Sequence, residues 1–146
     1  MTEFGLLQKK GIIAFTDGSK TIQNTRLMSR IMNSAYDLNA LIIQHAEDSD
    51  LADKGMMNDG IISTKLGLQG IPDVAERIII ERDLSLLEEH KCRYHISQIS
   101  SAKSVKLIKD KKNFLKFTCG VSINNLSLNE NDIGEFRTFL KLSPPL

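Results

Sequence analysis

Several features that would assign a protein to a broad class are absent from this sequence. Lys plus Arg number 19 and Asp plus Glu number 18, so the net charge of +1 gives no electrostatic basis for binding nucleic acid or an acidic membrane. The two cysteines are too few for the disulfide framework of a small secreted domain. No apolar run approaches the roughly 20 residues that span a bilayer, and the N-terminal residues do not form a signal peptide. We therefore expect a cytoplasmic protein with neither a nucleic-acid nor a membrane partner.

Nucleotide-binding signatures are also absent, because no P-loop is present and no G-x-G-x-x-G fingerprint follows an apolar run. What the sequence does contain is enough apolar residues (41%) in 146 positions to form one domain with one core. We expect residues 1–146 to form a single domain.

One stretch combines a buried strand with polar chemistry. The apolar residues 41–43 lead into Gln44 and His45, and the carboxylates of Glu47 and Asp48 follow. A short apolar run of this kind is typical of a parallel strand that is buried on both faces. Polar residues at the carboxyl end of such a strand are where α/β proteins place their active sites. A structural histidine at the end of a strand fits the same residues equally well.

Three further apolar runs predict strands, at residues 11–15, 93–99 and 114–121, and helical periodicity separates them at about residues 27–35, 74–87 and 105–108. Asn24 or Thr25 is suited to cap the first of these helices. The glycine-containing stretch 47–70 is expected to be a long polar loop. Strands and helices alternate four times, which predicts right-handed βαβ units and a parallel sheet.

Four stretches in register resemble dihydroorotase, a metal-dependent amidohydrolase of pyrimidine biosynthesis, and in particular its long, allantoinase-like bacterial type. They are residues 11–17, 44–48, 57–72 and 94–96 with 121–126. The resemblance covers about residues 3–146. It implies a partial (β/α)₈ TIM barrel that contains about four βα units, namely strands four to seven of the family barrel, with metal ligands at the carboxyl ends of the strands.

The same resemblance implies which positions would hold metal, and only one of them carries the expected side chain. His45 matches the histidine ligand after strand five. The acidic ligand after strand four falls on Gly18, with Asp17 one residue early. The ligand after strand six falls on Gln98, where the family has the second histidine of a His-x-x-His pattern.

Two further residues bear on this site. His95 lies three residues before Gln98 in the expected strand, so it should face the opposite side of the sheet, toward the helices or the surface. The run of residues 123–125 matches a family segment near the substrate, which makes Asn125 a candidate substrate-binding residue.

These substitutions matter because a catalytic metal needs about three protein ligands and an open position for water. The metal lowers the pKa of that water so that hydroxide can attack the amide carbonyl of the substrate. Glycine supplies no ligand, and a glutamine amide replaces imidazole poorly on a borderline-soft metal. The family's zinc is therefore expected to bind weakly here or not at all, and no catalytic residue is assigned.

Three alternative functions are compatible with the resemblance. In the first, the chain is a remnant of the hydrolase that is inactive on its own. In the second it is one piece of a split dihydroorotase that another chain completes, and in the third it is a non-catalytic scaffold that binds a transcarbamoylase. The clustering of substitutions at ligand positions, with the strand and helix pattern kept, favours the first. We also expect self-association, because strands four to seven alone leave two sheet edges open and Ile13, Phe15, Ile42, Ile96 and Phe117 are expected to border the exposed inner space.

Overall fold

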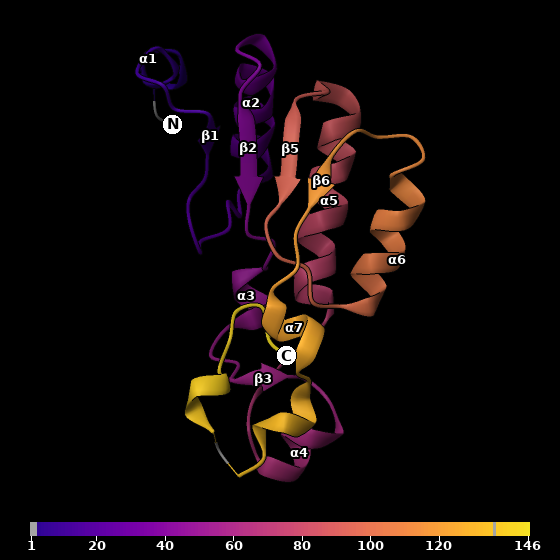
Figure 1. The fold of residues 1–146 in the computed structure, drawn as a ribbon. Helices are drawn as coiled ribbons and strands as arrows, with labels where there is room; N and C mark the ends of the chain where they lie inside the picture. The colour runs from indigo at the N-terminus through magenta and orange to yellow at the C-terminus, as the bar shows by residue number, and fades with distance from the viewer. Residues whose placement is uncertain (1–2, 136) are drawn as a thin grey trace.

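Four short parallel strands form the main sheet of the protein, whose computed structural model describes residues 3–135 and 137–146 (Figure 1). The strands lie in the order β1-β2-β5-β6, and each pairs in parallel with its neighbours. Their bounds are β1 Ala14–Phe15, β2 Leu41–Gln44, β5 Arg93–Ile96 and β6 Thr118–Cys119. The predicted four-stranded parallel sheet is therefore confirmed, although β1, β5 and β6 are shorter than the apolar runs that predicted them.

A helix precedes each strand of this sheet. These helices are α1 Phe4–Lys9, α2 Thr25–Asp37, α5 Val74–His90 and α6 Ala102–Lys111. Helices α2, α5 and α6 lie side by side on one face of the sheet, and α1 lies beyond the β1 edge (Figure 1). The unit is thus a fourfold repeat of helix and strand, which is the alternation that the sequence predicted.

Helix α2 illustrates how the sequence sets one of these elements. Asn24, one of the two residues predicted to cap this helix, is its N-cap. The Asn24 side chain accepts a hydrogen bond from the backbone N–H of Leu27 at 2.9 Å. The helix then buries Met28, Met32 and Ala35 completely, and their spacing places them on one face. That face packs against the sheet and α5.

The main core lies between the sheet and its helices. Phe15, Ile42, Ile96 and Phe117 all belong to it and are at most 9% exposed. They therefore do not border an exposed inner face, and that expectation is wrong for these four residues because their alternation along the strands points them to the helix side. Ile13, directly before β1, is 82% exposed as expected.

The stretch predicted as a long polar loop contains regular structure. Helix α3 Ser49–Ala52, strand β3 Met57–Asn58, helix α4 Ile61–Leu66 and strand β4 Gly70–Ile71 follow one another there. Strands β3 and β4 pair in parallel as a separate two-stranded sheet. The prediction was wrong because strands of two residues are too short to show a period, and because Gly55 and Gly70 lie in close contact with neighbouring chain.

The C-terminal part folds back over this excursion. Helix α7 Ile123–Ser127 is followed by the 3₁₀ turns η1 Glu130–Ile133 and η2 Thr138–Leu140. The tail, residues 141–146, then runs back to the carboxyl ends of the main strands (Figure 1). No helix in the described parts of the chain is long and apolar enough to cross a membrane.

Candidate active site

His45 lies where β2 ends and is almost fully buried, with 4% of its surface exposed. Its Nε2 atom is 3.1 Å from the Ser143 hydroxyl oxygen and 4.0 Å from Glu47 Oε1. The Ser143 hydroxyl lies 3.3 and 3.2 Å from the two Glu47 carboxylate oxygens. The tail therefore brings a serine between the histidine and the carboxylate that follow one strand.

Glu47 and His45 share the one hydrogen that the Ser143 hydroxyl can donate. A carboxylate only accepts hydrogen bonds, and a serine hydroxyl has one hydrogen to donate. When the Ser143 hydroxyl donates to Glu47, its oxygen can accept from the tautomer of His45 that carries a hydrogen on Nε2.

Thr21 holds the backbone around His45 in place. Its hydroxyl donates to the His45 carbonyl oxygen at 2.6 Å and accepts from the Glu47 N–H at 3.0 Å. Both bonds join the loop before α2 to the end of β2, so the positions of His45 and Glu47 are set by backbone contacts as well as by the tail.

The tail also contacts Asn125. Its side-chain amide donates to the Pro145 carbonyl oxygen at 2.8 Å, and Pro144 and Pro145 are both buried. His45 and Asn125, two of the candidate site residues, are therefore linked through the tail, which contacts His45 with Ser143 and Asn125 with Pro145.

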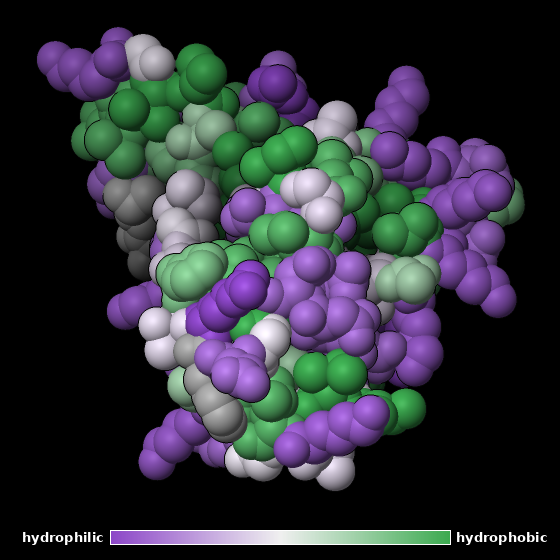
Figure 2. Space-filling model, turned by 60° about the horizontal axis from the view of Figure 1, so that its bottom comes forward, coloured by the Kyte–Doolittle hydropathy of each residue, from purple (hydrophilic) through white to green (hydrophobic). Residues whose placement is uncertain are grey.

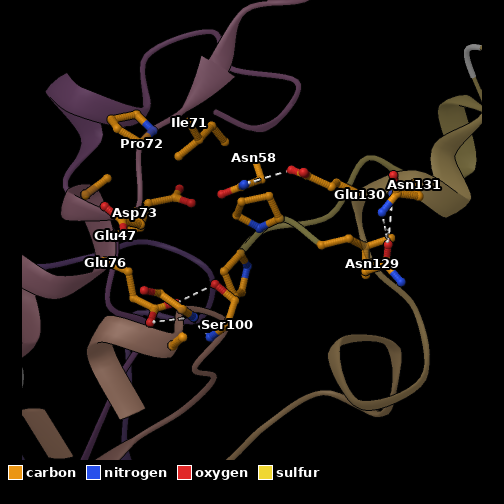
Figure 3. Close-up of a pocket in the computed structure, with 16 residues that line it drawn as sticks. Glu47, Asn58, Ile71, Pro72, Asp73, Glu76, Ser100, Asn129, Glu130 and Asn131 are labelled. Atoms are coloured by element: carbon orange, nitrogen blue, oxygen red, sulfur yellow. Dashed lines mark hydrogen bonds between the residues drawn. The ribbon is translucent and has the colours of Figure 1, made fainter. Parts of the chain in front are cut away.

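A cavity of about 480 Å³ opens beside the tail (Figure 3). Residues from β4, the first turn of α5, the loop before α6, η1 and the tail line it, and they include the carboxylates of Glu47, Asp73, Glu76 and Glu130. Two of these carboxylates have partners. Asp73 forms an ion pair with Lys103, whose Nζ lies 2.9 Å from Asp73 Oδ2, and Glu130 accepts a hydrogen bond from the Asn58 amide at 2.9 Å.

The Glu76 carboxylate is bound by the loop before α6. Its Oε2 atom accepts from the Ser100 N–H at 2.8 Å and the Ser100 hydroxyl at 2.6 Å, and its Oε1 atom accepts from the Ser101 N–H at 3.2 Å (Figure 3). Three donors satisfy this buried carboxylate. Glu76 therefore joins α5 to the start of α6, whose N-cap is Ser101.

Asp17 and Gly18 lie in the loop that follows β1. Asp17 is exposed and borders a smaller, mostly apolar cavity of about 240 Å³ between α1, β1 and α2. Gly18 has a φ of +69°, a left-handed conformation that a side chain would strain. The cavity beside the tail is lined by neither residue, nor by His45.

Gln98 is half-buried after β5 and does not line the tail cavity. The argument that placed His95 opposite Gln98 needs correction, because β5 ends at Ile96 and strand alternation does not reach Gln98. Tyr94 and Ile96 face the helices, so His95 lies on the other, open face of the sheet, where its Nδ1 atom is 2.7 Å from the Thr118 hydroxyl. His95 is half-buried on that face, so it does not pack toward the helix layer, which was one of its two expected surroundings.

These donors do not fit a catalytic metal centre of the kind that the resemblance to dihydroorotase implies. No three or more His, Cys, Asp or Glu side chains within residues 3–135 and 137–146 are grouped so that they could hold a metal ion. Gly18 carries no donor side chain, Gln98 offers an amide, and His45 Nε2 lies 3.1 Å from the Ser143 hydroxyl. A single imidazole falls short of the roughly three protein ligands that such a centre needs.

A second buried polar group lies on the helix side of the sheet, away from the cavity. Asp83 of α5 is fully buried, and it accepts from the Tyr94 hydroxyl at 2.6 Å and from Arg82 Nε at 2.8 Å. Burial raises the pKa of Asp83, and the neighbouring Arg82 opposes part of that rise. Burial and the charge of Asp83 raise the pKa of Tyr94, and burial raises the pKa of Cys92 to about 11. This group joins α5 to β5 and plays no part in the site.

Sequence reasoning missed the partners of His45. Glu47 carried a usable signal, because it follows the histidine by two residues. Ser143 and Thr21 carried none, since their contacts with His45 span 98 and 24 residues of chain. The Pro144-Pro145 pair in the tail was visible in the sequence, but nothing in it indicated where the tail would lie.

The fold defines the class first. The chain resembles solved hydantoinase-type structures over nearly all of its length. It matches a D-hydantoinase with a TM-score of 0.75 and 20% identity over 96% of this chain and 33% of that chain. It matches the dihydropyrimidinase from Brevibacillus agri NCHU1002 with a TM-score of 0.76 and 17% identity over 97% and 33%. At these identities the likeness shows the fold alone, and that fold is part of a TIM barrel.

The family follows from the sequence comparisons. The model of the family described as "Dihydro-orotase-like" matches residues 1–104. The dihydroorotase of Syntrophus aciditrophicus (strain SB) is 42% identical over all of this chain and 34% of its own length. That of Ehrlichia canis (strain Jake) is 38% identical over all of this chain and 33% of its own length. The chain belongs to the dihydroorotase-like family and spans about a third of the length of these curated relatives.

Proposed function

We propose that this chain is a dihydroorotase-like barrel unit that does not, on its own, catalyse the metal-dependent hydrolysis or cyclisation of the dihydroorotate ring. The observation that supports this is the donor set, because within residues 3–135 and 137–146 no three or more His, Cys, Asp or Glu side chains are grouped so that they could hold a metal ion. Glycine and glutamine occupy the other two positions of the described window that match family ligands. The proposal includes a weakly held or absent zinc ion and a cytoplasmic location.

The chemical reason is the lack of a means to generate hydroxide. Ring opening at neutral pH needs a metal that brings the pKa of bound water to near 7. His45, Glu47 and Ser143 offer an imidazole, a carboxylate and a hydroxyl, but Glu47 and His45 both contact the same serine rather than a water-sized position between them. Glu47 therefore holds the serine hydrogen and does not direct the imidazole as a base.

The test is turnover by the purified chain. We expect no opening of the dihydroorotate ring, followed by ultraviolet absorbance, under conditions in which the Syntrophus aciditrophicus dihydroorotase is active. Elemental analysis after dialysis against a weak chelator should find less than about one zinc per chain, since a stable site needs more donors. Two retained metal ions together with turnover would overturn the proposal.

A second experiment tests whether the two substituted ligand positions alone account for the expected lack of activity. The double change Gly18→Asp with Gln98→His restores the two side-chain types that the family places there, and we expect it to restore no activity because cooperating groups fail together. The matched control is the same double variant with His45→Ala. Turnover that appears in the repaired protein and disappears in the control would contradict the proposal.

A complementing chain and a transcarbamoylase are the other proposed partners. Turnover that appears only when a second polypeptide is added would make this chain one piece of a split enzyme. Co-purification with a transcarbamoylase, without turnover, would make it a scaffold.

A further inference from the structure

A cavity at the amino ends of the strands, at the opposite end of the sheet from His45, carries a further inference. Its volume is about 460 Å³. The end of α5, the connection from α5 to β5 and the connection from α6 to β6 line it, and both connections lie at the same end of the sheet (Figure 1). All of the lining belongs to residues 87–116. We propose that this cavity binds an amphiphilic carboxylate, a small molecule with one negatively charged head and an apolar chain or ring.

Apolar side chains supply a surface for the body of such a ligand. Leu87 and Cys92 are buried, Leu115 is half-buried, and Phe114 is 85% exposed beside them. Burial raises the pKa of Cys92 to about 11, so at pH 7 its thiol is neutral and behaves as a small apolar group. The volume lies within the roughly 300–1,000 Å³ of ligand pockets and is about three times that of a cavity that holds benzene.

The charged residues of the lining select the head group. They are Lys91, Lys116 and Glu88, and the Glu88 carboxylate forms an ion pair with Lys111 of α6. Among residues 3–135 and 137–146, no ion pair joins Lys91 or Lys116 to an acidic side chain. Two ammonium groups are therefore free to meet a carboxylate, whose charge-assisted hydrogen bonds are stronger than those of a neutral group.

The backbone at Lys91 is better suited to glycine than to lysine. Lys91 ends α5 with a φ of +53°, in the left-handed region, and its N–H donates to the Leu87 carbonyl oxygen at 2.9 Å. Glycine adopts this conformation at the end of a helix without the strain that a side chain brings. What the lysine adds at this position is a positive charge at the cavity.

The surroundings of the cavity are positively charged as well. Residues 103–116 contain six lysines and a single acidic residue, Asp110, although the net charge of the whole chain is only +1. Figure 2 shows hydrophilic side chains projecting from the side of the molecule that α6 forms. A local excess of positive charge raises the concentration of anions near the surface and disfavours cations. The potential around the cavity therefore favours the same head group as its lining.

Calorimetric titration of the whole chain tests the chemical class of the ligand. Octanoate is the probe, and octanol and octylamine are matched probes with a neutral and a positive head. We expect octanoate to bind at one site with a dissociation constant of about 1 mM or below, and the other two to bind at least about tenfold more weakly. Equal binding of all three, or no binding of octanoate, would overturn the proposal.

Two lysine variants test the site. Lys91→Gly and Lys116→Gln should each weaken octanoate binding by about threefold or more. Lys106→Gln is the matched control, because Lys106 is an exposed lysine of α6 that does not line the cavity. Lys91→Gly should also raise the melting temperature, because glycine relieves the strain at φ +53°, so weaker binding by this variant would not come from a damaged fold. Unchanged binding by both variants, or equal weakening by the control, would overturn the proposal.

Nuclear magnetic resonance locates the bound octanoate. We expect the largest saturable shifts at the backbone amides of Cys92 and Leu115, with no shift at Thr21 beside His45. Shifts centred on the tail cavity, or unsaturable shifts at exposed apolar residues such as Ile123 and Phe139, would overturn the proposal. The inference does not rest on the proposed lack of hydrolysis, because binding is measured here without turnover.

Discussion

Asp83 is a fully buried carboxylate whose surroundings compensate only part of the cost of its charge. Tyr94 and Arg82 both donate to it, yet burial still raises its pKa. A raised pKa in the folded state means that the folded protein holds this proton more tightly than the unfolded chain does. The contribution of Asp83 to stability is therefore fully present below 3.8, the ordinary pKa of an aspartate, and is lost as pH rises through the folded-state pKa.

We predict how the change Asp83→Asn alters the pH dependence of unfolding. The free energy of unfolding of the original chain minus that of the variant should be largest near pH 4 and should fall as pH rises toward 7. Urea unfolding followed by circular dichroism at several pH values measures it. Asp110→Asn, at an exposed aspartate of α6, is the control and should show no such trend. A difference that grows with pH would contradict the assigned direction.

At the scale of elements, the excursion between β2 and α5 depends on two close backbone approaches. A Cβ atom at Gly70 of β4 would lie 2.5 Å from Asp59 Cα, and one at Gly55 would overlap the side chain of Ile71. Such contacts force the neighbouring chain to move. The glycines therefore permit β3 and β4 to pair while the loops around them pack closely.

Replacing Gly70 with alanine should destabilise the protein by about 1–3 kcal/mol, the usual cost of overpacking. Thermal and urea unfolding measure the loss. Gly5→Ala is the matched change, because a Cβ at Gly5 would meet only Leu38 Cδ2 at 3.9 Å. In helix α1 that alanine should stabilise by roughly 0.5–1 kcal/mol. Equal effects of the two changes would show that the contact at Asp59 is not the cause.

The main sheet could be predicted from the sequence, and the excursion could not. Residues 74–87 carry a long apolar pattern with helical period, and residues 41–43 are a short continuous apolar run of the kind found in buried strands. Strand β3 and strand β4 are two residues each, and their packing depends on the close contacts at Gly55 and Gly70. Apolar runs also overstated β1 and β6, because Ile13 and Phe114 lie outside the strands and are exposed.

The site was predictable only as far as local sequence reaches. His45 at the end of a strand follows from the apolar run before it, and the resemblance to dihydroorotase places it among ligand positions. Its contact with Ser143 joins residues that are 98 positions apart, and no local pattern encodes that distance. The orientation of His95 was misjudged for a related reason, because the length of β5 depends on its neighbours in the sheet.

At the scale of the whole molecule, the self-association expected from the sequence would make thermal stability depend on protein concentration. For a dimer of a chain of this length, each tenfold rise in concentration should raise the melting temperature by about 2–3 °C. Calorimetry over a hundredfold range measures the shift. Ile13→Lys beside β1 should reduce the dependence, and Ile61→Lys, at an exposed residue of α4, should leave it unchanged. A melting temperature that is constant with concentration would contradict self-association.

The order of the strands has a consequence for synthesis on the ribosome. Strands lie in the sheet in the order in which the chain presents them, so each one leaving the ribosome finds its neighbour already made. The β1–β2 pair and α2 can form while the later strands are still being translated. A strand edge is therefore unpaired only until the next strand of the sheet has been made. Ser143 follows His45 by 98 residues, so their contact forms only after all four strands have been made. A ribosome stalled before the tail would carry the sheet with His45 not yet covered.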